Sequence, residues 1–410
     1  MPVTLDIDFV RQQFPAFQEP SLAGQAFFEN AGGSYACQQV IGRLDRYYRQ
    51  TKLQPYGVHP ASRAAGEAMD NAHVRLAQYL GVLPQEVHIG PSTSQNTYVL
   101  AQAFAKRLQP GDEIIVTNQD HEANSGVWRR LASQGIVIKE WQVDPVTGEL
   151  PMAALDALLS ARTRLVAFTH CSNILGQINP VAEICAKAHA VGARTVVDGV
   201  SYAGHGFPDV AELGVDIYLF SLYKTFGPHQ GVMVIRQDTA QFLGNQAHYF
   251  NEGLIHKWFV PAGPDHAQVA ASAGVAEYFD ALYAHHFPEG TPGQRTSHAV
   301  SGLMRSAEVR LLQQLLDFCK DDPRVRLLGP ANASERAATV SLLTPKRPAL
   351  EVAQRMADKG IICGASHFYA VRLLQAMGLE PDAGVLRLSF VHYTSAQEMT
   401  QLLQALDAVL

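Results

Sequence analysis

Short apolar runs alternate with helical patterns from about residue 85 to residue 236, and this alternation constrains the fold more than any other feature of the sequence. It is typical of βαβ units and therefore of a parallel sheet. Several runs are almost wholly apolar, as expected when helices cover both faces of the sheet. We predict strands at Glu113–Thr117, Ile136–Val143, Leu165–His170, Arg194–Asp198, Ile217–Ser221 and Gly231–Ile235, and helices at Asn124–Gln134, Ala153–Leu159 and Val181–Val191.

The pattern changes after Asp265, where long helical stretches replace the alternation. We predict helices at His266–His285, Gln294–Lys320 and Ala349–Lys359, strands at Val325–Leu328 and Ala338–Leu343, and a last amphipathic helix from Ala396. A turn-forming loop at residues 287–293 separates the first two helices. The sequence therefore predicts an α/β protein with a large domain over residues 21–265 and a smaller α/β domain over residues 1–20 and 266–410.

Charge and composition narrow the class of partner. The chain has 32 Lys and Arg against 38 Asp and Glu, a net charge of −6 without a dense basic run, which disfavours nucleic acid or an anionic membrane as a partner. Residues 1–8 lack the pattern of a secretory signal, and no apolar run reaches the ~18 residues of a transmembrane helix. Five cysteines without CxxC spacing disfavour disulfides and zinc. We expect a cytoplasmic protein that acts on a small molecule and holds no metal.

A lysine follows the end of one predicted buried strand. Lys224 comes just after Ile217–Ser221, and in open sheets of this kind ligands bind beyond the carboxyl ends of the strands. Burial would lower the pKa of its amine and make it a nucleophile toward an aldehyde, although a solvated loop lysine is the ordinary alternative. Asp198 ends the preceding strand and on its own resembles a turn or cap residue. Together they form the pair that pyridoxal phosphate (PLP) requires, because a carboxylate keeps its pyridine nitrogen protonated.

A turn before a predicted helix fits a phosphate group. The stretch Gly90-Pro91-Ser92-Thr93-Ser94 follows an apolar run and opens a predicted helix over Gln95–Arg107. Hydroxyl and backbone N–H groups at a helix N-terminus favour a dianion. The alternative is that Ser92 or Thr93 only caps the helix.

Polar residues also follow other predicted strands. His121 can stack on a planar ring there, and it belongs to no HExxH zinc motif because the second histidine position is Ser125. Asn173 can bind a cofactor phenolate or a substrate carboxylate, or it can simply form a turn. Arg387 lies in an apolar, strand-like run and needs an anion, either a substrate carboxylate bound bidentately or a structural ion pair.

Taken in chain order, these residues resemble the class V aminotransferase superfamily of fold-type I PLP enzymes, and specifically its cysteine desulfurase-like branch. The resemblance covers nearly the whole chain, from Phe28-Glu29-Asn30-Ala31-Gly32-Gly33 to Arg387–Tyr393. It implies a large domain with a mostly parallel, seven-stranded sheet, a smaller C-terminal α/β domain, and a homodimer with active sites at the interface. A loop of the partner subunit would close the phosphate site, and we expect that loop at Lys257–Asp265.

The resemblance assigns a role to each motif residue. It implies that Lys224 forms the Schiff base with PLP, that Asp198 pairs with the pyridine nitrogen and that His121 stacks on the ring, which makes these three the catalytic residues. Further cofactor contacts are expected from Ser92, Thr93, Ser94, Asn173, Ser201, Ser221 and Tyr223. Substrate contacts are expected from Asn30, Ala31, Gly32, Asn173, His367, Tyr369 and Arg387.

Three positions depart from the desulfurase pattern. Ser201 stands where desulfurases carry a glutamine that contacts the ring oxygen, and Tyr223 stands where they carry a histidine before the lysine. The loop that presents the desulfurase cysteine aligns with Ser366–Tyr369, so Tyr369 occupies the position of the thiol. Tyrosine cannot carry sulfane sulfur, and we expect Cys363, which precedes this loop, to be a buried strand-end cysteine.

The sequence therefore predicts a PLP enzyme that acts on an α-amino acid, with Lys224 as general base at Cα. The leading reactions are β-elimination with C–S cleavage, and transamination. Two proton-carrying side chains, His367 and Tyr369, replace the loop thiol and favour elimination. Epimerisation and a desulfurase reaction that uses Cys363 are the alternatives.

Two other enzyme classes fit the motifs less well. Residues 221–224 match the SxxK motif of serine acyl-transfer enzymes, but that motif should open a helix and be accompanied by KTG, whereas Lys224-Thr225-Phe226 lacks the glycine. A nicotinamide enzyme is disfavoured because no GxGxxG follows a strand.

Overall fold

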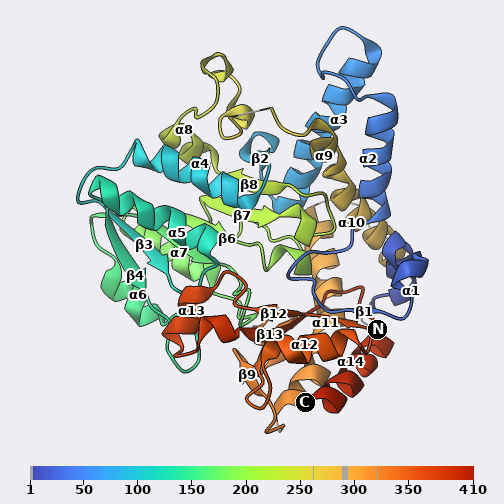
Figure 1. The fold of residues 1–410 in the computed structure, drawn as a ribbon. Helices are drawn as coiled ribbons and strands as arrows, with labels where there is room; N and C mark the ends of the chain where they lie inside the picture. Colours follow the sequence, from blue (N-terminus) through green and yellow to red (C-terminus); the bar gives the residue numbers. More distant parts are fainter. Residues whose placement is uncertain (1–2, 262, 289–293, 321) are drawn as a thin grey trace.

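The large sheet has seven strands in the order β2-β8-β7-β6-β5-β3-β4. The structure is a computed structural model that describes residues 3–261, 263–288, 294–320 and 322–410 (Figure 1). Neighbouring strands from β7 to β4 are parallel, whereas β8 is antiparallel to both β7 and β2. The strands are β2 (Val87–Gly90), β3 (Glu113–Thr117), β4 (Val137–Trp141), β5 (Thr163–Thr169), β6 (Arg194–Asp198), β7 (Ile217–Ser221) and β8 (Gly231–Ile235). The predicted seven-stranded, mostly parallel sheet is confirmed.

Helices cover both faces of this sheet because side chains alternate along each strand. Leu219 and Met233 pack with Phe104 on one face, whereas Phe220 and Val234 belong to the core on the other face. The first core includes residues of α4 (Thr93–Ala105), α5 (Glu122–Arg129) and α8 (Gln237–Leu243). The second includes residues of α2 (Gln38–Gln50), α3 (Pro60–Leu80), α6 (Met152–Leu158), α7 (Val181–Ala190), α9 (His266–Ala271) and α10 (Ala273–His286).

The C-terminal part contains a smaller antiparallel sheet in the order β12-β13-β10-β9, which confirms the predicted second α/β unit. Its strands are β9 (Arg326–Leu328), β10 (Thr339–Leu343), β12 (Gly364–Ser366) and β13 (Val385–Ser389). The helices around it are α11 (Gln294–Lys320), α12 (Ala349–Ala357), α13 (Val371–Ala376) and α14 (Ala396–Val409). Near the N-terminus, α1 (Ile7–Gln12) precedes β1 (Ala26–Phe27), which pairs in parallel with β11 (Ile361–Ile362). No helix in the described ranges is long and apolar enough to cross a membrane.

Three predicted helices differ from the structure. The helix predicted over Asn124–Gln134 is α5 followed by a 3-10 helix over Arg130–Gln134. The single helix predicted over His266–His285 is divided at Ser272 into α9 and α10. The Ser272 hydroxyl donates to the carbonyl of Gln268 at 2.9 Å, and such a bond competes with the helical backbone ladder. The helix predicted from Gln95 begins at Thr93, because Ser92 caps it by accepting a bond from the Gln95 N–H at 3.2 Å.

Helices α9 and α10 contact α2 and α3, and α10 also contacts α11. The domain boundary at residue 265 stays a prediction. The loop predicted at residues 287–293 lies mostly outside the described residues.

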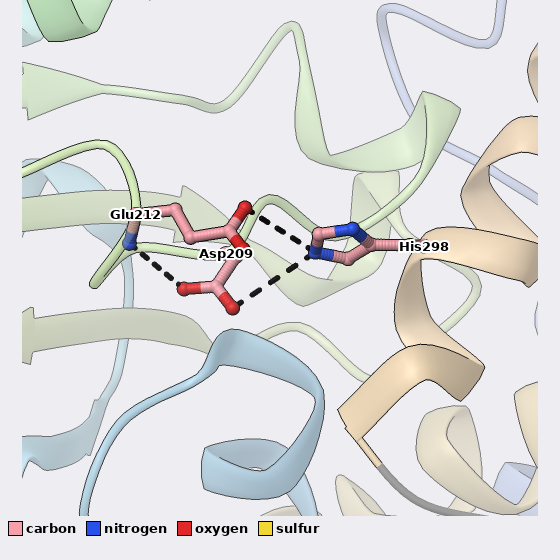
Figure 2. A group of neighbouring side chains, drawn as sticks. All are labelled: Asp209, Glu212 and His298. Atoms are coloured by element: carbon pink, nitrogen blue, oxygen red, sulfur yellow. Dashed lines mark hydrogen bonds and ion pairs between the residues drawn. The ribbon is translucent and has the colours of Figure 1, made fainter.

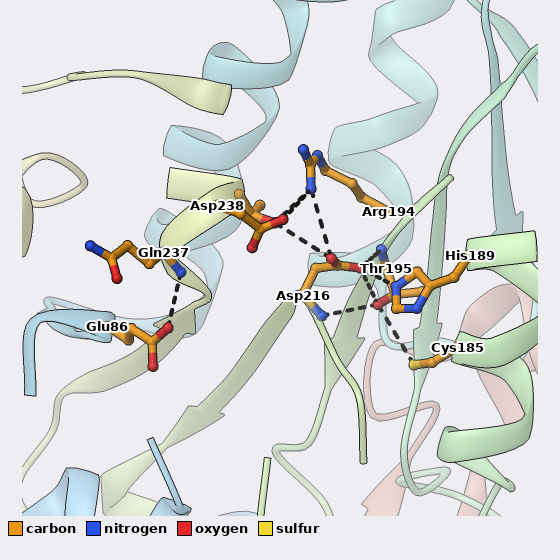
Figure 3. A network of polar contacts seen from close by, with 9 residues as sticks. Glu86, Cys185, His189, Arg194, Thr195, Asp216, Gln237 and Asp238 are labelled. Atoms are coloured by element: carbon orange, nitrogen blue, oxygen red, sulfur yellow. Dashed lines mark hydrogen bonds and ion pairs between the residues drawn. The ribbon is translucent and has the colours of Figure 1, made fainter. Parts of the chain in front are cut away.

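The amino-terminal edge of the large sheet is held by a buried polar network around Asp216 (Figure 3). The Asp216 carboxylate accepts bonds from the Thr195 N–H at 2.7 Å, the Thr195 hydroxyl at 2.8 Å and His189 Nε2 at 2.8 Å. A cavity of about 420 Å³ opens at this edge, where Arg194 pairs with Asp238 at 3.1 Å. Because these charged groups already pair with one another, we assign them a structural role, the stabilisation of this edge of the sheet.

An exposed ion-pair cluster joins the segment before β7 to α11 (Figure 2). His298 Nε2 lies 3.4 Å from Glu212 Oε2 and 3.9 Å from Asp209 Oδ2. Asp209 Oδ1 also accepts a bond from the Glu212 N–H at 3.0 Å. Surface ion pairs of this kind contribute little to stability, and local turn geometry accounts for their arrangement.

Candidate active site

A cavity of about 290 Å³ lies at the carboxyl ends of β5, β6 and β7, where the topology predicts a ligand site. All the residues that the sequence assigned to the cofactor line it. The lining residues are Ser92, Thr93, Ser94, His121, Ala123, Thr169, Cys171, Asn173, Asp198, Val200, Ser201, Ser221, Tyr223, Lys224 and His229. The structure thus brings together residues spread over more than a hundred positions of the chain, while their individual roles stay predictions.

Lys224 lies in a short 3-10 turn, Leu222–Lys224, directly after β7. Burial lowers the pKa of its amine from the usual 10.5 to about 8, and the positive charge of Arg387 acts in the same direction. Asp198 and Glu29 oppose this effect. A sizeable fraction of the amine is therefore neutral near physiological pH, as a nucleophile toward an aldehyde requires.

Asp198 ends β6 and is only 5% exposed. Its Oδ1 accepts a bond from the Val200 N–H at 2.9 Å. Burial raises the pKa of this carboxyl to about 6, even though the Val200 N–H and the charge of Lys224 lower it. A protonated pyridine nitrogen would give this buried carboxylate the cationic partner that it needs.

The first turn of α4 fits a phosphate group. Thr93 Oγ1 and Ser221 Oγ lie 2.8 Å apart, so hydroxyls from α4 and β7 meet at one place. Gly231 of β8 lets this turn approach closely, because a Cβ atom there would lie 2.4 Å from both Ser92 C and Thr93 N. Backbone N–H groups at the start of a helix, together with hydroxyls, form an anion site.

His121 follows β3 and caps α5, with Nδ1 accepting a bond from the Ala123 N–H at 3.1 Å. Burial lowers the pKa of its imidazole to about 4, and the charges of Lys224 and Arg387 add to this effect. The ring is therefore neutral at physiological pH, which suits stacking on a pyridine ring.

The loop expected to carry a desulfurase thiol lies beside His121 and is held in a strained conformation. Phe368 and Tyr369 have φ values of 46° and 59°, a region that favours glycine. Asn173 Nδ2 donates to the Phe368 carbonyl at 2.9 Å, and the Glu122 N–H donates to the Tyr369 carbonyl at 2.9 Å. The Tyr369 ring is 67% exposed, and its centroid lies 5.2 Å from that of His121. Tyr369 thus lies beside His121, although it is not among the residues that line the cavity with Lys224.

His367 belongs to the same loop. Its Nδ1 accepts a bond from the Tyr369 N–H at 3.1 Å, and its ring centroid lies 6.1 Å from the Tyr369 ring.

Two of the three predicted substrate residues near the N-terminus lie next to Lys224. Asn30 and Ala31 line a small cavity of about 10 Å³ together with Lys224, Ser201 and His205. The Ala31 N–H donates to Ser389 Oγ at 2.8 Å. Gly32 leaves room for Glu29, whose Oε1 would lie 2.7 Å from a Cβ at that position.

Arg387 has an anionic partner inside the protein. Its Nη2 donates to Glu29 Oε1 at 2.8 Å, and the side chain is 3% exposed. Of the two explanations that the sequence left open, the structure contains the ion pair. The Arg387 pKa is lowered by burial, an effect that Glu29 opposes.

None of the five cysteines provides a thiolate at neutral pH. Cys363 is half-buried, rather than fully buried as predicted, and is the single residue between β11 and β12. Burial and the charge of Glu29 raise the pKa of its thiol to about 12. Burial likewise raises the pKa of Cys171, which lines the cavity, to about 12.

Several lining residues were missed by the sequence reasoning. Thr169 is the last residue of β5, so the rule that found Asp198 applied equally to it. His229 stacks on Tyr223 with centroids 4.8 Å apart, and His205 pairs with Glu308 at 2.8 Å beside the small cavity. Neither histidine follows a strand end, so no local signal marked them. Glu29 lies within the motif Phe28–Gly33, but its contact with Arg387 joins residues 358 positions apart.

Lys224 and Asp198 line one cavity, an arrangement that fits the class of PLP-dependent enzymes. The chain belongs to the class V aminotransferase family, since the family description Aminotransferase class-V matches residues 26–253, more than half of its length.

Individual relatives agree with this assignment. The chain is 34% identical to Aminotransferase-like protein FGM3 of Gibberella zeae over 99% of both proteins. It is 30% identical to the cysteine desulfurase of Dickeya dadantii over 98% of this chain and 96% of that protein.

Solved structures show the same fold. The apo structure of cysteine desulfurase from Thermococcus onnurineus NA1 matches with a TM-score of 0.84 at 23% identity, over 100% of this chain and 98% of that one. A C-DES mutant with glycine covalently linked to the PLP cofactor matches with a TM-score of 0.76 at 21% identity, over 97% and 98%. The predicted family, its desulfurase-like branch and PLP as the cofactor are therefore confirmed.

Proposed function

We propose that this enzyme acts on an α-amino acid through Lys224 and cleaves a bond at Cβ, with C–S cleavage as the leading reaction. The observation that carries the proposal is the convergence of Lys224, Asp198 and the α4 turn on one cavity, next to a loop with tyrosine in the thiol position. PLP, when bound there, withdraws electrons from the Cα atom of a joined amino acid.

The chain's own residues supply the proton transfers. The Lys224 amine, with a pKa of about 8, takes the proton from Cα as general base. Asp198 holds a proton on the pyridine nitrogen through its negative charge. The neutral His121 ring covers one face of the cavity and excludes water from it. Tyr369, close to His121, gives its hydroxyl proton to the departing sulfur.

Persulfide chemistry is disfavoured at this site. A desulfurase needs a nucleophilic thiolate that reaches the substrate sulfur, whereas the thiol of Cys363 has a pKa of about 12. Transamination is the second candidate, because FGM3, with 34% identity over nearly the full chain, is named an aminotransferase-like protein. Epimerisation is a third outcome that the same experiment detects.

We further expect a cytoplasmic homodimer with active sites at its interface. The segment Lys257–Asp265, except for residue 262, lies in the described part of the chain, and its contribution to a partner subunit stays a prediction. The division into domains at residue 265 is likewise part of the proposal.

A panel of amino acids mixed with the holoenzyme tests the proposal. The absorbance of the bound cofactor and the products are measured together. Pyruvate and sulfide from L-cysteine support the lyase, whereas a 2-oxo acid with pyridoxamine phosphate indicates the aminotransferase. Racemised substrate indicates the epimerase, and alanine with a persulfide indicates the desulfurase. If no amino acid changes the spectrum, the proposed function is wrong. The Lys224→Ala variant should lose all turnover, and Lys346→Ala, an exposed lysine, should retain it.

A further inference from the structure

Arg387, which the sequence assigned to the substrate carboxylate, already forms a partly buried ion pair with Glu29. Arg387 Nη2 donates to Glu29 Oε1 at 2.8 Å. The guanidinium also lies 3.6 Å above the centre of the Phe368 ring, and its Nη1 donates to the Asn173 carbonyl at 3.3 Å. An ionised carboxylate at this distance offsets the positive charge. Arg387 therefore attracts a second carboxylate less strongly than an unpaired arginine would.

The Glu29 side chain lies in a slot between two glycines. A Cβ atom at Gly32 would lie 2.7 Å from Glu29 Oε1, and one at Gly364 would lie 2.5 Å from Oε2. Gly364 is also the direct sheet partner of Arg387, so the slot and the arginine belong to the same strand pair. Because any larger residue at these positions would collide with the carboxylate, the Glu29–Arg387 pair is a built-in part of the site.

Three buried polar atoms around this pair have no hydrogen-bond partner within the described residues, namely Arg387 Nε, Glu29 Oε2 and Asn173 Oδ1. Buried polar atoms are normally paired, so their accumulation at one place indicates a ligand. The set consists of one donor and two acceptors. The donor suits an α-carboxylate, whereas the two acceptors require hydrogen-bond donors. An ammonium or guanidinium group supplies such donors with the positive charge that an ionised Glu29 favours.

The pair also acts on the reacting lysine. Asn173 lines the same cavity as Lys224. The charge of Arg387 lowers the pKa of Lys224, and the charge of Glu29 raises it. The three atoms therefore lie within electrostatic reach of Lys224, and one of them belongs to a residue of its cavity.

We propose that Glu29 is a specificity-determining residue that selects α-amino acids with a cationic side chain, which for C–S cleavage carries the cation on the group bonded to sulfur. The α-carboxylate contacts Arg387, and the side-chain cation contacts Glu29 Oε2 and Asn173 Oδ1. This inference rests on the proposed function, because it needs an amino acid to bind beside Lys224.

Isosteric amino acids test the inference on the holoenzyme. L-Ornithine is compared with L-norleucine, and L-2,4-diaminobutyrate with L-norvaline, since each pair differs only by an ammonium in place of a methyl group. The apparent dissociation constant is measured from the change in cofactor absorbance. A charge-assisted hydrogen bond predicts that at least one cationic member binds at least about tenfold more tightly than its isostere.

The variant Glu29→Gln keeps the size of the side chain and removes its charge. It should bring the cationic and neutral members to within about threefold of each other, whereas the exposed control Glu149→Gln should keep the wild-type preference. Cofactor content and circular dichroism show whether the variant folds. The comparison of isosteric amino acids on the wild type tests the inference even if the variant does not fold.

Equal binding of the isosteres by the wild type overturns the inference while other amino acids still change the spectrum. So does a Glu29→Gln variant that retains the preference or binds all four amino acids more tightly by the same factor. A spectrum that responds to no amino acid of the wider panel refutes the proposed function itself.

Discussion

Replacing Lys224 by methionine should stabilise the cofactor-free protein at neutral pH. Burial lowers the pKa of the Lys224 amine from 10.5 to about 8, so the folded state binds this proton less tightly than the unfolded state does. Each tenfold change in proton affinity is worth about 1.4 kcal/mol, which makes the buried charge cost about 3 kcal/mol below pH 8. Methionine has a similar volume and no charge, so Lys224→Met should recover most of this free energy of unfolding.

The pH dependence gives the sign of the effect. Between pH 8 and 10.5 the unfolded chain carries more protons than the folded one, so the wild type gains stability as the pH rises. The stability difference between Lys224→Met and wild type should therefore shrink to roughly half by pH 9.5. Urea unfolding followed by circular dichroism at pH 7 and pH 9.5 measures it, with the exposed Lys346→Met as control. A variant that is no more stable than wild type at pH 7, or a difference that does not fall at high pH, would refute a buried, destabilised lysine.

Three more predictions concern residues around the active site. Gly231→Ala should weaken PLP retention at least about tenfold, because its Cβ would meet the backbone of Ser92 and Thr93 at 2.4 Å. The control Gly42→Ala, with open space around it, should retain PLP as the wild type does. Equilibrium dialysis measures the dissociation constant of PLP for both variants. Tyr369→Phe should lower kcat for elimination on the order of 10²-fold while exchange of the Cα proton with solvent continues, and an unchanged kcat would exclude Tyr369 as the proton donor. Cys363→Ser should leave turnover unchanged, because a thiol with a pKa of about 12 is protonated at neutral pH. Loss of turnover in this variant would instead support a desulfurase reaction.

The cofactor cavity was predictable because its residues lie next to strand ends. Asp198 ends β6, Lys224 comes shortly after β7, and Asn173 comes shortly after β5. Parallel strands bring their carboxyl ends to one edge of a sheet, so strand positions alone place these side chains together. The strands themselves were predictable because residues of β3, β6 and β7 are buried on both faces and read as apolar runs.

The substrate side of the site was less predictable, because it depends on contacts between distant parts of the chain. Glu29 and Arg387 are 358 residues apart, and β1, β11 and β13 bring them together. Nothing in the local sequence of Arg387 distinguishes a substrate carboxylate from Glu29 as its partner. The break between α9 and α10 was missed because Ser272 lies in an otherwise regular helical pattern, which the single glycine two residues later, Gly274, does not interrupt.

The most direct test of the central claim is to find which lysine carries the cofactor. The holoenzyme is reduced with borohydride, which fixes PLP to the lysine that binds it, and the labelled peptide is identified by mass spectrometry. The label should lie on Lys224 in stoichiometric amount and should be absent from Lys224→Ala. A label on another lysine, or a reduced holoenzyme without label on Lys224, would contradict the assignment of this cavity as the active site.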